Sequence, residues 1–239
     1  MDGAKKVIPR PAATIIAARD SSGTLEVLML RRNLQSAFGR GAFVFPGGTL
    51  DSSDSDPDVQ ARCVGLTDSK ASAVLGLDSG GLAYWVAALR ECFEEAGLLL
   101  AYRDGELLRF DQPEVEMRFA EHRNAINHGD LGFPEMCRVE DLQLAVDRVH
   151  YVANWVTPEG LPRRYDTRFF VAGAPEGQVP MHDSRETIDH IWVSPAEAIR
   201  RHQSGEIELM LPTMRNLERL QSYGSVRDLL AKHSGPRTP

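Results

Sequence analysis

The stretch Arg90-Glu91-Cys92-Phe93-Glu94-Glu95-Ala96-Gly97 decides how this chain is interpreted. It ends an apolar periodicity that begins at Leu82, in which every third or fourth residue falls on one side of a helix. Gly97 is a natural terminus, because glycine adopts the left-handed conformation that closes a helix. We therefore predict a helix over residues 82–96.

Three carboxylates gather on one side of this helix. Glu91, Glu94 and Glu95 stand at i, i+3 and i+4, so they share one wedge of the helix, opposite its apolar stripe. Like charges this close repel by roughly 0.2–0.5 kcal/mol per pair, and a hard divalent cation would relieve the repulsion. Arg90 can reach Glu94 four residues later and fix its rotamer. The alternative is an acidic helix face that is merely solvated.

A glycine loop precedes the helix. Phe45-Pro46-Gly47-Gly48 ends a short expected strand, and its glycines allow a ligand to approach the backbone closely. Together with residues 90–98, this loop resembles the signature of the Nudix hydrolase family: Gly, five residues, Glu, seven residues, then Arg-Glu-apolar-x-Glu-Glu-x-Gly-apolar. Gly48 opens the pattern. The second half matches position by position at Arg90, Glu91, Cys92, Glu94, Glu95, Gly97 and Leu98.

The first half of the signature departs from the family in two ways. Asp54 stands five residues after Gly48, where the family has glutamate. The connection to the second half, residues 55–89, has 35 residues instead of seven. Asp51 or Asp56 could take the place of Asp54, or none of the three could serve. We expect this acidic segment to be solvated rather than catalytic.

Further stretches of the chain resemble one branch of this family in particular. Residues 155–159 and 163–170 look like the WxTPE…RRFDTxFF stretch of a Nudix branch that also carries a long insertion inside the signature. That branch includes the animal organelle coenzyme A diphosphatases. Residues 186–198 and 211–213 are similar to it as well, whereas Tyr165 stands where phenylalanine is usual.

The fold class expected from these patterns is α/β. Strands and helices mix without strict βαβ alternation, so we predict a Nudix-like α/β/α sandwich with a mixed sheet and added helices. We expect a single domain over residues 1–239, with a helical addition at about 112–147. Residues 51–81 lack periodicity, and we interpret them as an inserted loop or small lid rather than core. The expected elements are hairpins at 14–31 and 98–110, strands at 42–45, 149–156 and 168–172, and helices at 82–96, 194–203, 212–223 and 225–232.

The resemblance implies hydrolysis of a phosphoric anhydride in a nucleoside diphosphate linked to another moiety. Bound Mg²⁺ or Mn²⁺ would neutralise phosphoryl oxygens and activate a water. In the family the general base is sometimes a glutamate of the signature and sometimes lies on a distant loop. Glu186 is the best distant candidate, with His182 as a second. The implied metal ligands are the Gly47 carbonyl and the carboxylates of Glu91, Glu94 and Glu95.

Arginines are the candidates for binding the anionic substrate. Arg163 and Arg164 come first, with Arg31 and Arg32 behind them, and Gly48 supplies backbone next to the ligand. The fork of a guanidinium suits bidentate recognition of phosphate. The alternative is that these arginines pair with surface carboxylates.

Composition excludes several functional classes. The 239 residues are 42% hydrophobic and 26% charged, with a net charge of −7, as in an ordinary soluble globular protein. The longest clean apolar run, residues 12–18, is too short to span a membrane. An acidic chain without a basic patch argues against a nucleic-acid partner. Three widely spaced cysteines without a CxxC pattern indicate a reduced, cytoplasmic protein.

Two functions follow as hypotheses. The first is a metal-dependent diphosphatase whose partner is a small-molecule nucleotide or coenzyme: coenzyme A, one of its thioesters such as acyl-CoA, or a related nucleotide. The alternative is a non-catalytic Nudix module that binds or senses a nucleotide. The intact set of three glutamates favours the enzyme. The sequence leaves the oligomeric state open.

Overall fold

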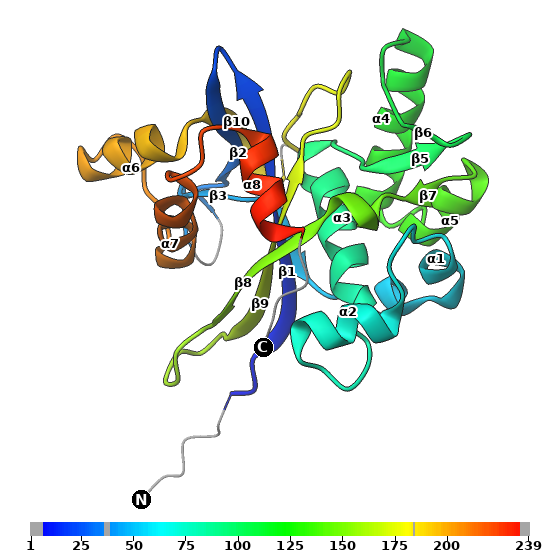
Figure 1. Cartoon of the computed structure of the whole chain (residues 1–239), viewed down its shortest axis with the longest axis horizontal. Coiled ribbons are helices and arrows are strands. Elements are labelled where there is room, and N and C mark those ends of the chain that lie inside the picture. The colour runs from blue at the N-terminus through cyan, green and yellow to red at the C-terminus, as the bar shows by residue number, and fades with distance from the viewer. Residues whose placement is uncertain (1–6, 36–38, 184, 235–239) are drawn as a thin grey trace, which may run out of the picture.

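The hairpin expected near the N-terminus forms the middle of a mixed sheet. The computed structural model describes residues 7–35, 39–183 and 185–234. In it, β1 (Arg10–Ser21) pairs antiparallel with β2 (Thr24–Arg32) and parallel with β9 (Tyr165–Gly173). The strand order is β10-β2-β1-β9-β8, with β3 beside β2 and β4 beside β1 (Figure 1). The remaining strands of this sheet are β3 (Phe43–Val44), β4 (Gly47–Thr49), β8 (His150–Val156) and β10 (Thr187–Val193).

Helices cover both faces of this sheet. Successive strand residues point to opposite faces, so Leu28 and Leu30 pack with α3 (Leu82–Ala96), whereas Val27 and Met29 pack with the C-terminal helices. Those helices are α6 (Pro195–Gln203), α7 (Leu211–Leu220) and α8 (Val226–His233). The predicted α/β/α sandwich is confirmed, and the bounds of α3 agree with the predicted 82–96.

The interpretation of residues 51–81 as a loop or lid outside the core was wrong. They form η1 (Ser52–Ser55), α1 (Pro57–Ala61) and α2 (Asp68–Leu75), which pack beside α3 (Figure 1). Val59, Ala71 and Leu75 are buried in the same core as α3. These helices are too short for their periodicity to be visible among the surrounding aspartates, serines and glycines.

Residues 112–147, the predicted helical addition, are largely helical. The addition consists of α4 (Pro113–His128) and α5 (Phe133–Val139), followed by η2 (Val146–Arg148). Its end also contributes β7 (Gln143–Leu144), which the sequence did not indicate. β7 pairs with β5 (Ala101–Arg103), which forms the predicted second hairpin with β6 (Glu106–Leu107).

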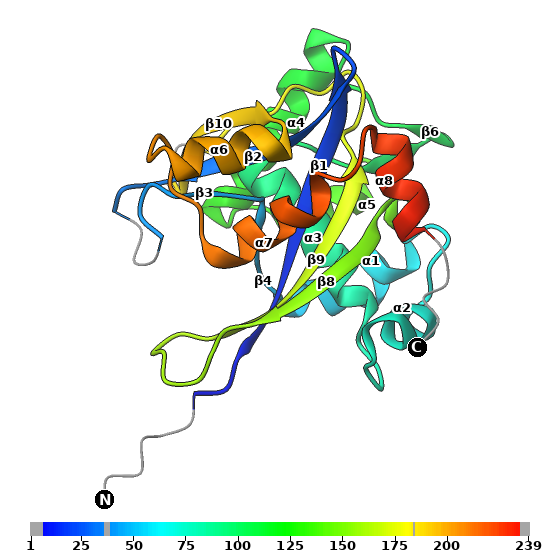
Figure 2. The same cartoon turned by 60° about the vertical axis from the view of Figure 1, so that its left-hand side comes forward.

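The hairpin of β8 and β9 extends beyond the rest of the sheet, next to the start of β1 (Figure 2). In the described part of the chain, no helix combines the length and the apolar character that a bilayer crossing requires. The single domain over residues 1–239 stays a prediction.

Candidate active site

The helix α3 is held at its N-terminal end by the insertion. Its own N-cap, Gly81, offers no side chain, and the carboxylate of Asp68 in α2 accepts hydrogen bonds from the amides of Leu82, at 2.9 Å, and Gly80, at 3.0 Å. A Cβ on Gly81 would lie 2.3 Å from the Ser72 amide nitrogen, so only glycine allows α2 to pack this closely. The insertion therefore caps the helix that carries the glutamates.

The C-terminal end of α3 is closed as predicted. Gly97 adopts the left-handed conformation with φ +72°. A second contact at this end of the helix was not indicated by the sequence. Buried Arg123 of α4 donates hydrogen bonds to the carbonyls of Glu94 and Glu95, both at 2.9 Å. A guanidinium is well placed there, because the last carbonyls of a helix lack partners and carry partial negative charge.

The glycine loop meets the glutamates, as the signature implies. The Gly47 amide donates to Glu95 Oε2 at 3.0 Å. A Cβ on Gly48 would lie 2.4 Å from Glu91 Oε1, so the carboxylate occupies the space that any other residue would need. Glu95 is only 7% exposed, so the acidic wedge is not a solvated helix face.

Arg90 is buried, and its guanidinium donates hydrogen bonds to three carboxylates. Its Nη1 donates to Glu91 at 2.9 Å and to Glu94 at 3.1 Å. Its Nε and Nη2 donate to the two oxygens of Asp54, and Nη2 also reaches the Thr49 carbonyl. The predicted orientation of Glu94 by Arg90 is confirmed.

The expectation that the acidic segment is solvated was wrong for Asp54, which is 1% exposed. Asp51 and Asp56 instead cap η1 and α1. Asp54, near the start of the insertion, is thus the aspartate of the three whose carboxylate accepts hydrogen bonds from Arg90.

The electrostatics of the site favour a cation. Burial raises the pKa of Glu91 to about 7 and also raises the pKa values of Glu94 and Glu95. The Arg90 charge opposes this rise at Glu91 and Glu94. Three carboxylates thus surround the Arg90 guanidinium, and the carboxylate of Glu95 lies on the same helix face. This oxygen-only, negatively charged donor set fits Mg²⁺ or Mn²⁺.

The carboxylates that are expected to bind the metal do not point toward one common position in the structure. Within the described residues, no three side chains of His, Cys, Asp or Glu are grouped as a ready metal site. The hydrogen bonds give the reason: Glu91 and Glu94 turn toward Arg90, and Glu95 turns toward the Gly47 amide. The metal ligands therefore stay a prediction supported by the chemistry of the donors.

The two distant candidates for the general base, Glu186 and His182, lie on the segment before β10. The charge of Glu186 contributes to the raised pKa of Glu95, and the charge of Arg32 opposes it, so both act on the same carboxylate. The Glu186 carbonyl accepts from the Asn33 amide at 2.8 Å, which fixes its turn to the end of β2. His182 lies beside His190, with ring centroids 6.5 Å apart, and its role as a base stays a prediction.

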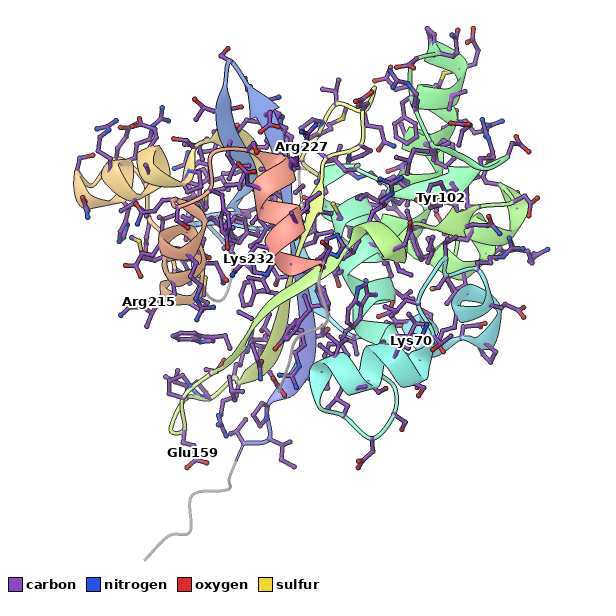
Figure 3. All side chains as sticks on the ribbon, in the orientation of Figure 1. Lys70, Tyr102, Glu159, Arg215, Arg227 and Lys232 are labelled. Carbon is purple, nitrogen blue, oxygen red and sulfur yellow. The ribbon has the colours of Figure 1, made fainter. Side chains whose placement is uncertain are left out.

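Three arginines that were expected to bind the substrate, Arg31, Arg163 and Arg164, lie in other parts of the fold. Arg164 is buried, and its guanidinium donates to the carbonyls of Thr157 at 2.9 Å and Val7 at 2.8 Å, so we reassign it from substrate binding to holding this hairpin. Arg163 is exposed in the same loop, whose outer end carries Glu159 (Figure 3); its binding role stays a prediction. Arg31 lines a cavity of about 640 Å³ beside α6, across the sheet from α3.

Comparison with known proteins decides the family. Residues 66–220, more than half of the chain, match the family model of the NUDT19 Nudix domain. The chain belongs to the Nudix family. This confirms the resemblance drawn from the signature.

The chain is also similar to curated acyl-coenzyme A diphosphatases. The acyl-coenzyme A diphosphatase NUDT19 of Xenopus laevis is 27% identical, over 88% of this chain and 63% of that protein. Its Homo sapiens counterpart is 28% identical, over 85% of this chain and 62% of that protein. The chain thus spans a little less than two thirds of the length of these two relatives.

A solved Nudix structure confirms the fold. The crystal structure of a NUDIX hydrolase from Alicyclobacillus acidocaldarius aligns with a TM-score of 0.74 and 28% identity, covering 96% of this chain and 99% of that one. The expectation of a Nudix hydrolase related to coenzyme A diphosphatases is therefore confirmed at the level of family.

Proposed function

We propose that this Nudix chain is a divalent-metal-dependent diphosphatase that hydrolyses the diphosphate of coenzyme A or an acyl-CoA. The observation that carries the proposal is that Asp54, Glu91 and Glu94 accept hydrogen bonds from buried Arg90, while buried Glu95 accepts from the amide of Gly47 in the glycine loop. The activity named for the relatives supports the choice of substrate.

The proposed metal ligands are Glu91, Glu94, Glu95 and the Gly47 carbonyl. Mg²⁺ or Mn²⁺ held there would supply charge neutralisation at the diphosphate and a water of lowered pKa. Arg90 keeps Glu91 and Glu94 in place through its hydrogen bonds. It therefore acts by orienting carboxylates, since its own donors are directed at the protein.

Glu186 is the proposed general base. It belongs to the turn before β10, and its charge acts on Glu95. A carboxylate on this separate element can accept a proton from the attacking water without giving up a bond to Arg90. Arg32 supplies a positive charge near the same carboxylates, and we propose that Arg32 and Arg163 contact the anionic substrate.

The test is hydrolysis of coenzyme A with Mg²⁺ or Mn²⁺, followed by product identification. We expect a 3′,5′-ADP and a phosphopantetheine product, no turnover in excess chelator, and no turnover by Glu95→Gln. Tight nucleotide binding without turnover of any coenzyme or nucleotide would support the sensor alternative instead.

We also propose a cytoplasmic location. Cys63, Cys92 and Cys137 are free thiols, and burial raises the pKa of each to about 12, which suppresses the reactive thiolate. Titration of the denatured, unreduced protein from its native cells should find three thiols per chain. An oxidised pair would contradict a reducing compartment.

A further inference from the structure

The last turn of α3 is joined to α4 through its backbone. The two carbonyls that accept from Arg123 belong to Glu94 and Glu95, whose side chains form part of the proposed metal site. Asn127, one turn later on α4, donates to the Glu94 carbonyl at 3.2 Å. A Cβ on Gly97 would approach Arg123 Nη1 to 3.3 Å, so glycine gives the guanidinium its room.

The turn that carries Glu186 is organised by one carboxylate. Asp183 Oδ1 accepts from the amides of Arg185 at 3.2 Å, Glu186 at 3.1 Å and Thr187 at 2.8 Å. It also accepts from the Thr187 hydroxyl at 2.9 Å. Consecutive amides directed at one anion fix the backbone of the turn, and with it the starting direction of the Glu186 side chain.

The same helix α4 contacts this turn. Arg185 donates to the Asn127 carbonyl. The charge of Asp183 acts on Arg123, opposing the effect of burial on that guanidinium. In Figures 1 and 2, the yellow segment before β10 passes beside the green α4. α4 therefore touches both halves of the proposed site, which are about ninety residues apart in sequence.

We propose that Arg123 is a positioning residue that holds the end of α3 and the Asp183 turn in one arrangement, so that Glu94 and Glu95 face Glu186. The inference rests on the proposed function for its catalytic consequence. Its structural part stands on the hydrogen bonds of Arg123 to the end of α3 and on the hydrogen bond of Arg185, which joins the turn to the same helix one turn further along. A displacement of about 1 Å between groups that must act together can cost on the order of 100-fold in rate.

Three variants separate positioning from general support. Arg123→Met removes the donors but keeps much of the apolar stem. Arg123→Lys keeps the charge without the two-pronged fork, and it guards against failure of the first variant to fold. Arg118→Met is the matched control, because Arg118 lies on the same helix, is largely exposed and pairs with Glu140.

Two readouts are needed. The first is hydrogen exchange of the Glu186 and Thr187 amides without substrate or metal, with the β1–β2 hairpin as internal reference. The second is steady-state hydrolysis of coenzyme A. We expect Arg123→Met to speed exchange in the turn but not in the β1–β2 hairpin, and to lower kcat by about 100-fold with little change in KM. Arg123→Lys should recover part of kcat, and Arg118→Met should resemble the wild type.

Unchanged exchange at Glu186 and Thr187 in Arg123→Met would overturn the proposal. So would an unchanged kcat, or a kcat that falls only in proportion to the folded fraction. If the wild type hydrolyses nothing while exchange still responds as expected, the proposed function fails and the link between α3 and the turn stands.

Discussion

Arg90 binds Asp54 through one edge of its guanidinium: Nε lies 2.8 Å from Oδ1, and Nη2 lies 3.0 Å from Oδ2. The two residues are 36 positions apart and both are buried. Through this pair, the insertion determines the orientation of the arginine that in turn holds Glu91 and Glu94.

Asp54→Asn should destabilise the fold and reduce activity together. Removing one partner of a buried ion pair leaves an uncompensated charge and costs about 3–5 kcal/mol. Urea denaturation of the variant measures this loss. Asp78→Asn is the control, because Asp78 is exposed in the same insertion; equal stability of the two variants would contradict a structural role for Asp54.

Glu95→Gln should remove turnover while the fold persists. A glutamine oxygen can still accept from the Gly47 amide, and the change removes a buried charge rather than creating one. We expect kcat to fall by orders of magnitude with a melting temperature at or above that of the wild type. A parallel loss of activity and thermal stability, followed by circular dichroism, is the outcome that speaks against this.

Gly48→Ala should weaken metal activation. The added Cβ would stand 2.4 Å from Glu91 Oε1 and force that carboxylate to move, whereas the backbone can stay. We expect a higher Mg²⁺ concentration for half-maximal activity. Gly132→Ala is the matched control, since its Cβ would meet nothing closer than Pro134 at 3.8 Å; a similar shift in both variants would sink the explanation.

Asp68→Ala should destabilise the protein in a pH-dependent way. Hydrogen bonds from the Leu82 and Gly80 amides lower the pKa of Asp68, although partial burial opposes them. A depressed folded-state pKa contributes stability above the unfolded value, about 3.9, and that stability is lost as the pH falls through the folded value. The cost should be about 1 kcal/mol at pH 7.

Urea denaturation of Asp68→Ala and wild type at pH 7, 4 and 3 checks this prediction. The difference between the two proteins should narrow toward the lowest pH. Asp78→Ala serves as the reference for a carboxylate that is exposed on the same insertion. A difference that stays constant with pH would falsify the capping role.

Local patterns predicted much of the fold. The bounds of α3, its end at Gly97 and the helix that begins at Pro195 each follow from periodicity and capping residues a few positions apart. The three glutamates were found because the spacing within residues 90–98 matches a family pattern. These features share one property: their determinants lie close together in the chain.

The features that the sequence did not indicate depend on distant contacts. Nothing near Arg123 shows that its guanidinium binds the carbonyls of another helix. Arg163 and Arg164 were expected to bind the substrate. The guanidinium of Arg164 instead donates hydrogen bonds to a backbone carbonyl of its own hairpin and to one of the N-terminal segment. A basic residue has the same sequence signature in either role, and only the tertiary fold distinguishes them.

The split signature also has a consequence for how such a chain could have changed during evolution. Lengthening the connection between its halves from seven to 35 residues costs only about 1.4 kcal/mol of loop-closure entropy. The Asp68 cap comes from the lengthened connection and can offset much of that cost, whereas Asp54 precedes this connection. A chain shortened to the seven-residue spacing would therefore close its loop easily and keep Asp54, but it would lose the contact that caps the N-terminal end of α3.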